Sequence, residues 1–384
     1  MTAKIYTTLI LLFLSLSAFS QTRCGTLQPA DSQIITETST AQTRDLITIS
    51  VLFHVVYNTD EQNISDSQIF SQIDVLNEDF RAANDQTNVP VGFQDDIADA
   101  EIEFCLAQRL PDGTATTGII RTPTTETLIG LKQVLYTTSP AADSEHYLNV
   151  WVADLGGGLN GTATFPDSTT PDKDGIIIDP HFVGTTGLAA VETRYNLGRT
   201  LTHEIGHYLD LFHVFGTTTS GSCNSDDFVE DTPNGENTYL GDCPTGIEFS
   251  CNSSDMWMNF MYFTDDACMS MFSAGQKTRM QNTLLTTRSG LAESDGCLPV
   301  STRETEEETQ ITLLPNPAKN QFNVITGGLI YDELRIFSGR GEEVFYLKNI
   351  SDNSVIDCAK FPRGLYFVLL RNAERQSVQR IVLQ

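Results

Sequence analysis

The feature that most constrains the fold of this chain is a group of histidines near its middle. The run His203-Glu204-Ile205-Gly206-His207 is followed six residues later by His213. On a helix, side chains four residues apart share a face, so His203 and His207 can bind one Zn²⁺ with Glu204 beside it. His213 can reach the same ion only if the helix ends and the chain turns back. The spacing therefore predicts a helix, a sharp turn and a metal site.

The same residues predict the chemistry. Three neutral imidazoles leave Zn²⁺ its charge and an open fourth position, where the pKa of a bound water falls to about 7. Glu204 is then the expected general base for that water. A purely structural zinc site is disfavoured, because such sites usually close the fourth position with a protein ligand.

The overall charge and the N-terminus indicate where the protein acts. The 384 residues carry a formal net charge of −27, which disfavours nucleic acid as a partner. Residues 1–20 contain Lys4 and then an apolar stretch at 9–16, which predicts a signal peptide cleaved before Gln21. No apolar run reaches the roughly 18 to 20 residues that span a bilayer. We therefore expect an exported chain without a transmembrane segment in its mature form.

Local patterns predict two domains of different class. Strands are expected at 48–57, 102–107, 119–121 and 147–153, and a helix is expected from Ser65, so the first domain should be α+β.

An acidic segment separates this domain from a second one. Residues 298–310 are predicted to be a solvated linker, since 301–310 holds four Glu and no aliphatic residue. Residues 311–384 alternate short apolar runs with Gly, Asn and Pro turns, which predicts a small all-β sandwich.

The zinc motif and several segments around it resemble the metzincin metalloproteases, within them the pappalysin or cytophagalysin group. The matching segments follow in order at 53–57, 76–80, 102–107, 203–213 and 259–269. The resemblance implies a pro-segment at 21–43 and a catalytic domain at 44–297, built from a mixed twisted sheet with active-site and backing helices. It also implies that Met261 forms the Met-turn beneath the metal.

Two residues depart from the metzincin pattern. Asp210 replaces the usual Gly at the turn out of the helix, and Asp tolerates the left-handed conformation better than most residues. Phe263 stands where the group tends to carry a Tyr that assists the tetrahedral intermediate, so we expect reduced turnover. Tyr262 can substitute only if the turn has a different geometry.

The resemblance also implies that Cys223 pairs with Cys251 and Cys243 with Cys268. Sequence alone allows three pairings of these four, and a Cys105–Cys297 bridge with a free Cys358 is a further guess. The loop between His213 and Met261 contains hard oxygen ligands that can hold Ca²⁺, although a merely solvated loop is the alternative. The candidate ligands are Asp226, Asp227, Glu230, Asp231 and Thr232.

Cys24 lies in an Arg23-Cys24-Gly25 run that resembles a cysteine switch. A thiolate is a good zinc ligand, so it would displace the catalytic water and keep the enzyme latent. Cleavage near Thr43-Arg44 would activate it. A disulfide from Cys24 to Cys105 or Cys297 is the open alternative.

Metzincins bind substrate as an added strand at a sheet edge, and the segment 147–153, leading into glycines at 156–158, is the edge expected here. Asp265 and Asp266 could attract an Arg or Lys after the scissile bond, although the sequence does not show which acid faces the pocket.

The final domain, with Leu314-Pro315-Asn316-Pro317 near its start, resembles the sorting domain of the type IX secretion system. A glycan- or protein-binding sandwich is the alternative.

These observations predict a secreted or surface zinc endopeptidase that acts on protein or peptide substrates and is exported by that machinery. A non-catalytic secreted binding or adhesion protein on a metzincin scaffold is the competing hypothesis.

Overall fold

The computed structural model describes residues 22–27, 46–216, 221–236, 238–300, 311–338, 343–372 and 376–384. The predicted signal peptide and the Thr43-Arg44 site lie outside these residues, as does the acidic run 301–310. The chain divides into two compact units, Met1–Ser301 and Thr302–Gln384. The division falls inside the segment predicted to be a linker.

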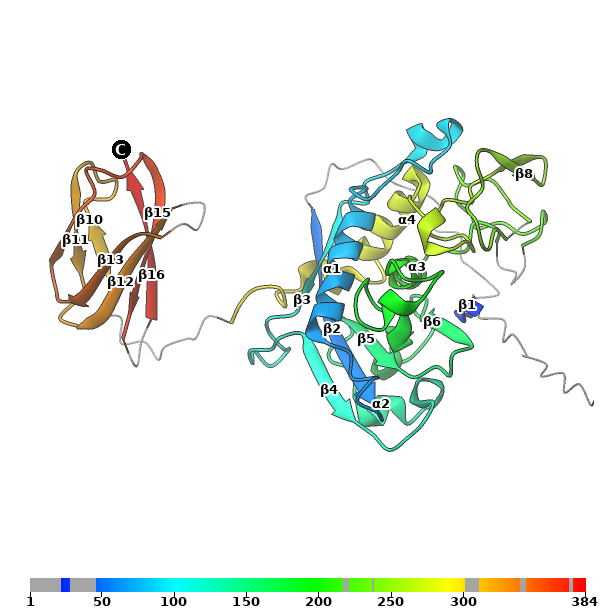
Figure 1. The fold of residues 1–384 in the computed structure, drawn as a ribbon, viewed down its shortest axis with the longest axis horizontal. Coiled ribbons are helices and arrows are strands. Elements are labelled where there is room, and N and C mark those ends of the chain that lie inside the picture. Colours follow the sequence, from blue (N-terminus) through cyan, green and yellow to red (C-terminus); the bar gives the residue numbers. More distant parts are fainter. Residues whose placement is uncertain are drawn as a thin grey trace, which may run out of the picture. The chain divides into compact units, whose positions relative to one another are not determined.

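A seven-stranded sheet forms the frame of the first unit (Figure 1). Its order is β1-β6-β7-β5-β2-β3, and β4 also pairs with β2. The strands are β1 (Thr22–Cys24), β2 (Ile47–Tyr57), β3 (Ile102–Leu106), β4 (Ile119–Pro123), β5 (Leu148–Ala153), β6 (Leu159–Ala163) and β7 (Ile176–Ile178). All pairs are parallel except β6 with β7.

The central strand β2 is buried on both faces, as its β-branched and aromatic sequence predicts. Val51, Phe53 and Val55 enter the main core, whereas Leu52 and Val56 pack into smaller clusters on the other face. The expected strands at 48–57, 102–107, 119–121 and 147–153 correspond to β2, β3, β4 and β5.

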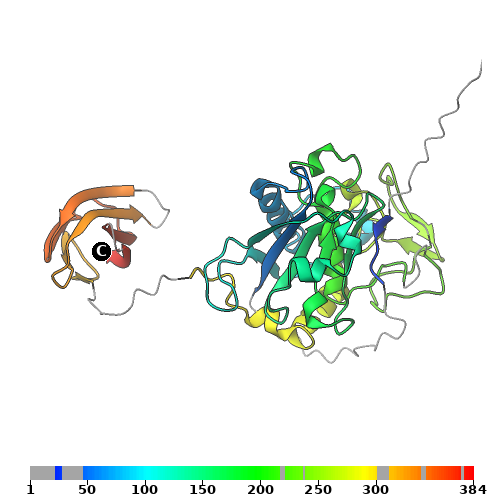
Figure 2. The same ribbon diagram turned by 90° about the horizontal axis from the view of Figure 1, so that it is seen from below.

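Two helices cover the face of the sheet that carries the main core (Figure 1, Figure 2). Helix α1 (Asp66–Phe80) begins where expected, since the Ser65 side chain caps it by accepting a hydrogen bond from the Gln68 amide. Helix α3 (Arg199–Tyr208) packs against α1 and β6. The remaining helices are α2 (Leu135–Thr138), α4 (Ala274–Leu285) and α5 (Ser289–Glu293). This arrangement confirms the α+β class.

The prediction that the segment 147–153 forms the substrate-binding edge of the sheet was wrong. The predicted segment forms β5, which is fully buried and paired with β2 on one side and β7 on the other. The outer strand is β6, and β1 occupies its free edge in parallel, with Cys24 opposite Gly161. The strong apolar character of β5 marks a central strand, because an edge does not require burial on both faces.

The second unit is a sandwich of two antiparallel sheets, as predicted. One has the order β10-β11-β14 and the other β13-β12-β15-β16, and a shared core of apolar side chains lies between them. The strands are β10 (Thr312–Leu314), β11 (Gln321–Ile325), β12 (Tyr331–Ser338), β13 (Glu343–Ile350), β14 (Ser354–Asp357), β15 (Gly364–Arg371) and β16 (Gln376–Leu383). In the described part of the chain, none of the helices has the length and apolar character needed to cross a membrane.

Candidate metal centre and cleft

The helix α3 ends where the metal motif requires. It stops at Tyr208, and Asp210 adopts the left-handed conformation with φ of 73°. The Leu211 amide then donates to the Gly206 carbonyl at 2.8 Å, which closes the turn. As a result the chain reverses and His213 returns toward His207.

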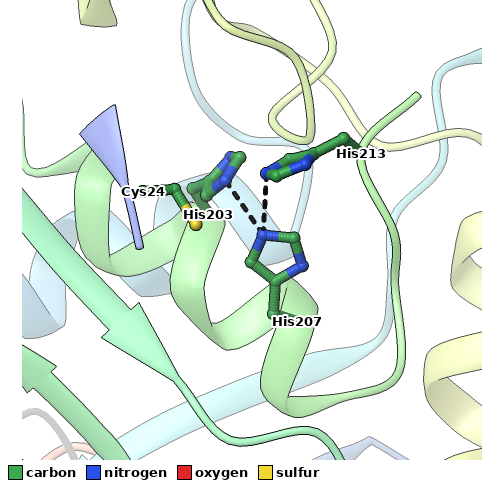
Figure 3. Close-up of side chains that lie close together, drawn as sticks. All are labelled: Cys24, His203, His207 and His213. Carbon is green, nitrogen blue, oxygen red and sulfur yellow. Dashed lines mark hydrogen bonds between the residues drawn. The ribbon is translucent and has the colours of Figure 1, made fainter. Parts of the chain in front are cut away.

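The three imidazoles converge on one point (Figure 3). Nε2 of His207 lies 3.1 Å from Nε2 of His203 and 3.1 Å from Nε2 of His213. His203 Nδ1 bonds the Phe260 carbonyl at 2.7 Å, and His207 Nδ1 bonds the Leu211 carbonyl at 2.7 Å. A carbonyl only accepts, so both Nδ1 atoms carry the proton and both Nε2 atoms present lone pairs. Facing lone pairs repel unless a cation lies between them, so the donor set fits Zn²⁺.

Burial keeps these rings neutral. It lowers the pKa of His207 to about 4 and the pKa values of His203 and His213 well below their ordinary value. Neutral imidazole is the form that binds a metal. Burial also raises the pKa of the Glu204 carboxyl to about 7, which suits a group that takes up and releases a proton near neutral pH.

Cys24 supplies a fourth donor from the N-terminal segment. Its Sγ and one ring nitrogen from each of the three histidines all lie within 4.8 Å of one another, and Figure 3 shows the side chain directed at the histidines. The disulfide alternative fails, because Cys24 is free and Cys105 pairs with Cys297. Burial and the neighbouring Glu204 raise the pKa of the Cys24 thiol, so a thiolate at this position needs a nearby cation.

Arg23 fills an acidic pocket beside the histidines. Its guanidinium donates to Asp266 Oδ1 at 2.9 Å and to the Thr264 carbonyl at 2.8 Å, and it lies 5.1 Å from the centre of the Tyr195 ring. Asp265 instead holds Arg194 through two nitrogens, at 3.0 and 2.7 Å. Of the two predicted acids, Asp266 therefore contacts the N-terminal segment, whereas Asp265 is paired with Arg194.

Thr26 contacts both the candidate base and the sheet edge. Its hydroxyl donates to Glu204 Oε2 at 2.7 Å and accepts from the Ala163 amide at 2.8 Å. Neither Thr26 nor Arg23 was predicted as a contact of the site. Their positions next to Cys24 are the only sequence signal for them, since their partners lie more than 100 residues away.

The Met-turn lies against the helix as the resemblance implies. The Met261 side chain fills the space beside Gly206, where a Cβ atom would lie 2.2 Å from Met261 Sδ. The Phe263 ring lies 4.6 Å from the His213 ring, at the metal site. Tyr262 is fully buried and packs against Phe215 and Tyr239, so it does not replace the missing tyrosine at the metal.

The disulfides Cys223–Cys251 and Cys243–Cys268 form as the resemblance implies, and Cys358 is free. The candidate calcium ligands have other partners. Asp227 accepts from the Thr232 hydroxyl, and Asp231 accepts from Ser273 and the Gly275 amide at the start of α4. Among the described residues, the clusters of three or more metal-binding side chains include none of the five candidate ligands, so calcium stays a prediction.

Comparisons with known proteins agree with this geometry. The family model described as pregnancy-associated plasma protein-A matches residues 136–285, and the secretion system C-terminal sorting domain matches residues 312–384. An extracellular metalloprotease of Verticillium alfalfae is 30% identical over 277 residues, which are 67% of this chain and 88% of the relative.

Two solved structures from Tannerella forsythia are also similar. A promirolysin mutant superposes with a TM-score of 0.58 at 42% identity, over 65% of this chain and 83% of that one. Mature mirolysin in complex with a cleaved peptide gives a TM-score of 0.58 at 42% identity, over 65% of this chain and 95% of that one.

The fold and the converging imidazoles define a secreted zinc metalloprotease. Within this class, the chain belongs to the pappalysin family of metzincins, is of the mirolysin type, and carries a type IX sorting domain at its C-terminus. These relatives support the prediction of an enzyme over that of a non-catalytic binding protein.

Proposed function

We propose that the protein is an endopeptidase in which Glu204 is the general base and which cleaves before Arg or Lys. His203, His207 and His213 would hold the zinc ion, which supplies a Lewis acid for the scissile carbonyl and for the attacking water. Glu204 takes the proton from that water and passes it to the leaving amine. Its raised pKa, near 7, allows both steps at neutral pH.

The preference for a basic residue rests on Arg23. In this structure Arg23 stands in for a substrate side chain, and its guanidinium meets a fully buried carboxylate, a carbonyl and an aromatic face. A pocket of this kind attracts a cation and penalises a neutral side chain. Without a cation, the buried Asp266 charge would keep only the Leu197 and Arg199 amides, which bond its Oδ2. Peptide main chain would take the place of β1 on the edge of β6.

Protein from which the pro-segment has been removed is expected to cleave a peptide library before Arg and Lys. A chelator and the Glu204→Ala substitution should each abolish cleavage, because one removes the metal and the other removes the base. The measurement is mass spectrometry of the products. Stoichiometric zinc binding without cleavage would contradict the proposal.

Asp266→Asn provides the test of the pocket, with Asp265→Asn as its matched control. Loss of one partner of a buried ion pair costs on the order of 3 kcal/mol, so Asp266→Asn should lower kcat/KM for Arg peptides by roughly 100-fold. Asp265→Asn should have a smaller effect, because its partner is Arg194. Equal losses in the two variants would exclude Asp266 as the specificity residue.

We also infer that the N-terminal segment keeps the enzyme latent. Cys24 can complete the metal site, Arg23 fills the acidic pocket, Thr26 engages Glu204, and β1 covers the β6 edge. Each contact blocks a different requirement of the reaction: the open metal position, the specificity pocket, the base and the binding edge.

Full-length Cys24→Ala protein is expected to cleave peptides at least 10-fold faster than the full-length parent, because water regains access to the metal. Full-length Cys358→Ala is the matched control, since Cys358 is the other free, buried cysteine and lies in the second unit. Initial rates, measured before any self-cleavage, provide the comparison. A Cys24→Ala protein as inactive as the parent would show that Arg23, Thr26 and β1 suffice for latency and that the thiol adds nothing to it, which would rule out the switch.

Phe263 is expected to reduce turnover. It lies beside His213 at the metal and has no hydroxyl to donate to a tetrahedral intermediate. Phe263→Tyr should therefore raise kcat, by roughly 10-fold if one new hydrogen bond forms in the transition state. An unchanged or lower kcat in steady-state assays would remove this explanation.

A further inference from the structure

We propose that Arg279 and Asp210 form a positioning pair that holds the turn carrying the third histidine to the metal. The inference rests on the proposed zinc site and adds two residues that touch neither metal nor substrate. It also explains how this chain tolerates Asp at the position where the metzincin pattern has Gly.

Asp210 lies at the point where the chain leaves the helix. Its φ of 73° is in the region that L-residues other than Gly avoid, because Cβ crowds the carbonyl oxygen. The Asp210 amide donates to the His207 carbonyl at 3.0 Å. The next residue, Leu211, provides the carbonyl that fixes the His207 ring. A change in this turn would therefore move both His207 and His213.

Arg279 holds this turn from the neighbouring helix α4. Its Nε lies 3.0 Å from Asp210 Oδ2, its Nη1 donates to the Asp227 carbonyl at 3.3 Å, and its guanidinium lies 5.0 Å from the Phe212 ring centre. Both side chains of the ion pair are less than one-fifth exposed. The Arg279 side chain thus contacts the turn, the residue before His213 and the loop that follows.

Helix α4 is itself fixed to the metal site. Ser273 and Gln276 form a capping box at its start, and Gln276 exchanges hydrogen bonds with Asn259 of the Met-turn, at 2.7 and 3.0 Å. The Asn259 side chain in turn accepts from the Met261 amide at 2.9 Å. Arg279 therefore joins the turn to a helix that already holds the floor of the site.

This arrangement makes a distinctive prediction. If the ion pair offsets the strain of the left-handed turn, then Gly at 210 should make Arg279 dispensable for metal binding, since Gly adopts this conformation without cost. Ala at 210 should be worse than Gly, because it has neither the carboxylate nor the conformational freedom.

The test is the rate of zinc release to a chelator from the full-length chain in a Glu204→Ala background, which prevents self-cleavage. Arg279→Met should release zinc roughly 10-fold faster than the parent, which is the low end of the effect of losing a residue that orients a metal ligand. Asp210→Ala should behave likewise, whereas Asp210→Gly and the Asp210→Gly, Arg279→Met double variant should stay within about 2-fold of the parent. Lys277→Met is the control on α4, since Lys277 pairs with Glu101 away from the turn.

Thermal unfolding of the zinc-free variants separates positioning from general stability. If Arg279→Met lowers the melting temperature of the zinc-free protein but leaves the zinc release rate unchanged, the pair is only structural and the proposal is overturned. Equal release rates for Asp210→Ala and Asp210→Gly would also overturn it. If Arg279→Met does not fold, Arg279→Gln provides the same comparison, because it also removes the charge that pairs with Asp210. These readouts do not use peptide cleavage. If the variants release zinc as predicted but the protein with Glu204 intact cleaves no peptide, only the proposed function is contradicted.

Discussion

The fold brings the Nε2 atoms of three imidazoles together at one point, and the organisation of the site follows from this crowding. Two carbonyl groups accept hydrogen bonds from Nδ1 of His203 and Nδ1 of His207. The Nε2 atoms of these two rings therefore face each other, 3.1 Å apart. In a buried, water-poor setting such an arrangement is stable only around a cation. One of the two carbonyls belongs to the Met-turn and the other to the turn after α3, so the metal joins two segments that are far apart in sequence.

The N-terminal segment is complementary to this centre at several points. Cys24 offers a soft ligand, Arg23 neutralises the buried Asp266, and Thr26 satisfies one oxygen of Glu204. The groups that make the site reactive are costly to bury without partners, and the segment supplies a partner for each of them. The proposed latency and the stability of the precursor would then have the same physical source.

The structural features that depend on local sequence pattern could be predicted from the sequence. The spacing of His203, His207 and His213 requires the helix to end between His207 and His213, and it ends at Tyr208. The same holds for β2 and α1, whose apolar patterns are strong. The resemblance supplied the disulfide pairs, which spacing alone left open.

Other features could not be predicted because they depend on tertiary contacts. Strand β6 has the sequence LNGTA, which lacks the β-branched pattern of a strand, so the edge was assigned to the more apolar β5. Asp265 and Asp266 are adjacent in sequence, and only the tertiary contacts show that Asp265 pairs with Arg194 and Asp266 with Arg23. The contact of Arg23 with Asp266 spans 243 residues and has no local signature.

The proposed latent enzyme holds zinc through three imidazoles and one sulfur. X-ray absorption at the zinc edge of the full-length protein should show one sulfur at about 2.3 Å and nitrogens at about 2.0–2.1 Å. The sulfur should disappear when the pro-segment is removed. Absence of zinc, or a sulfur-free zinc environment in the full-length chain, would contradict the account.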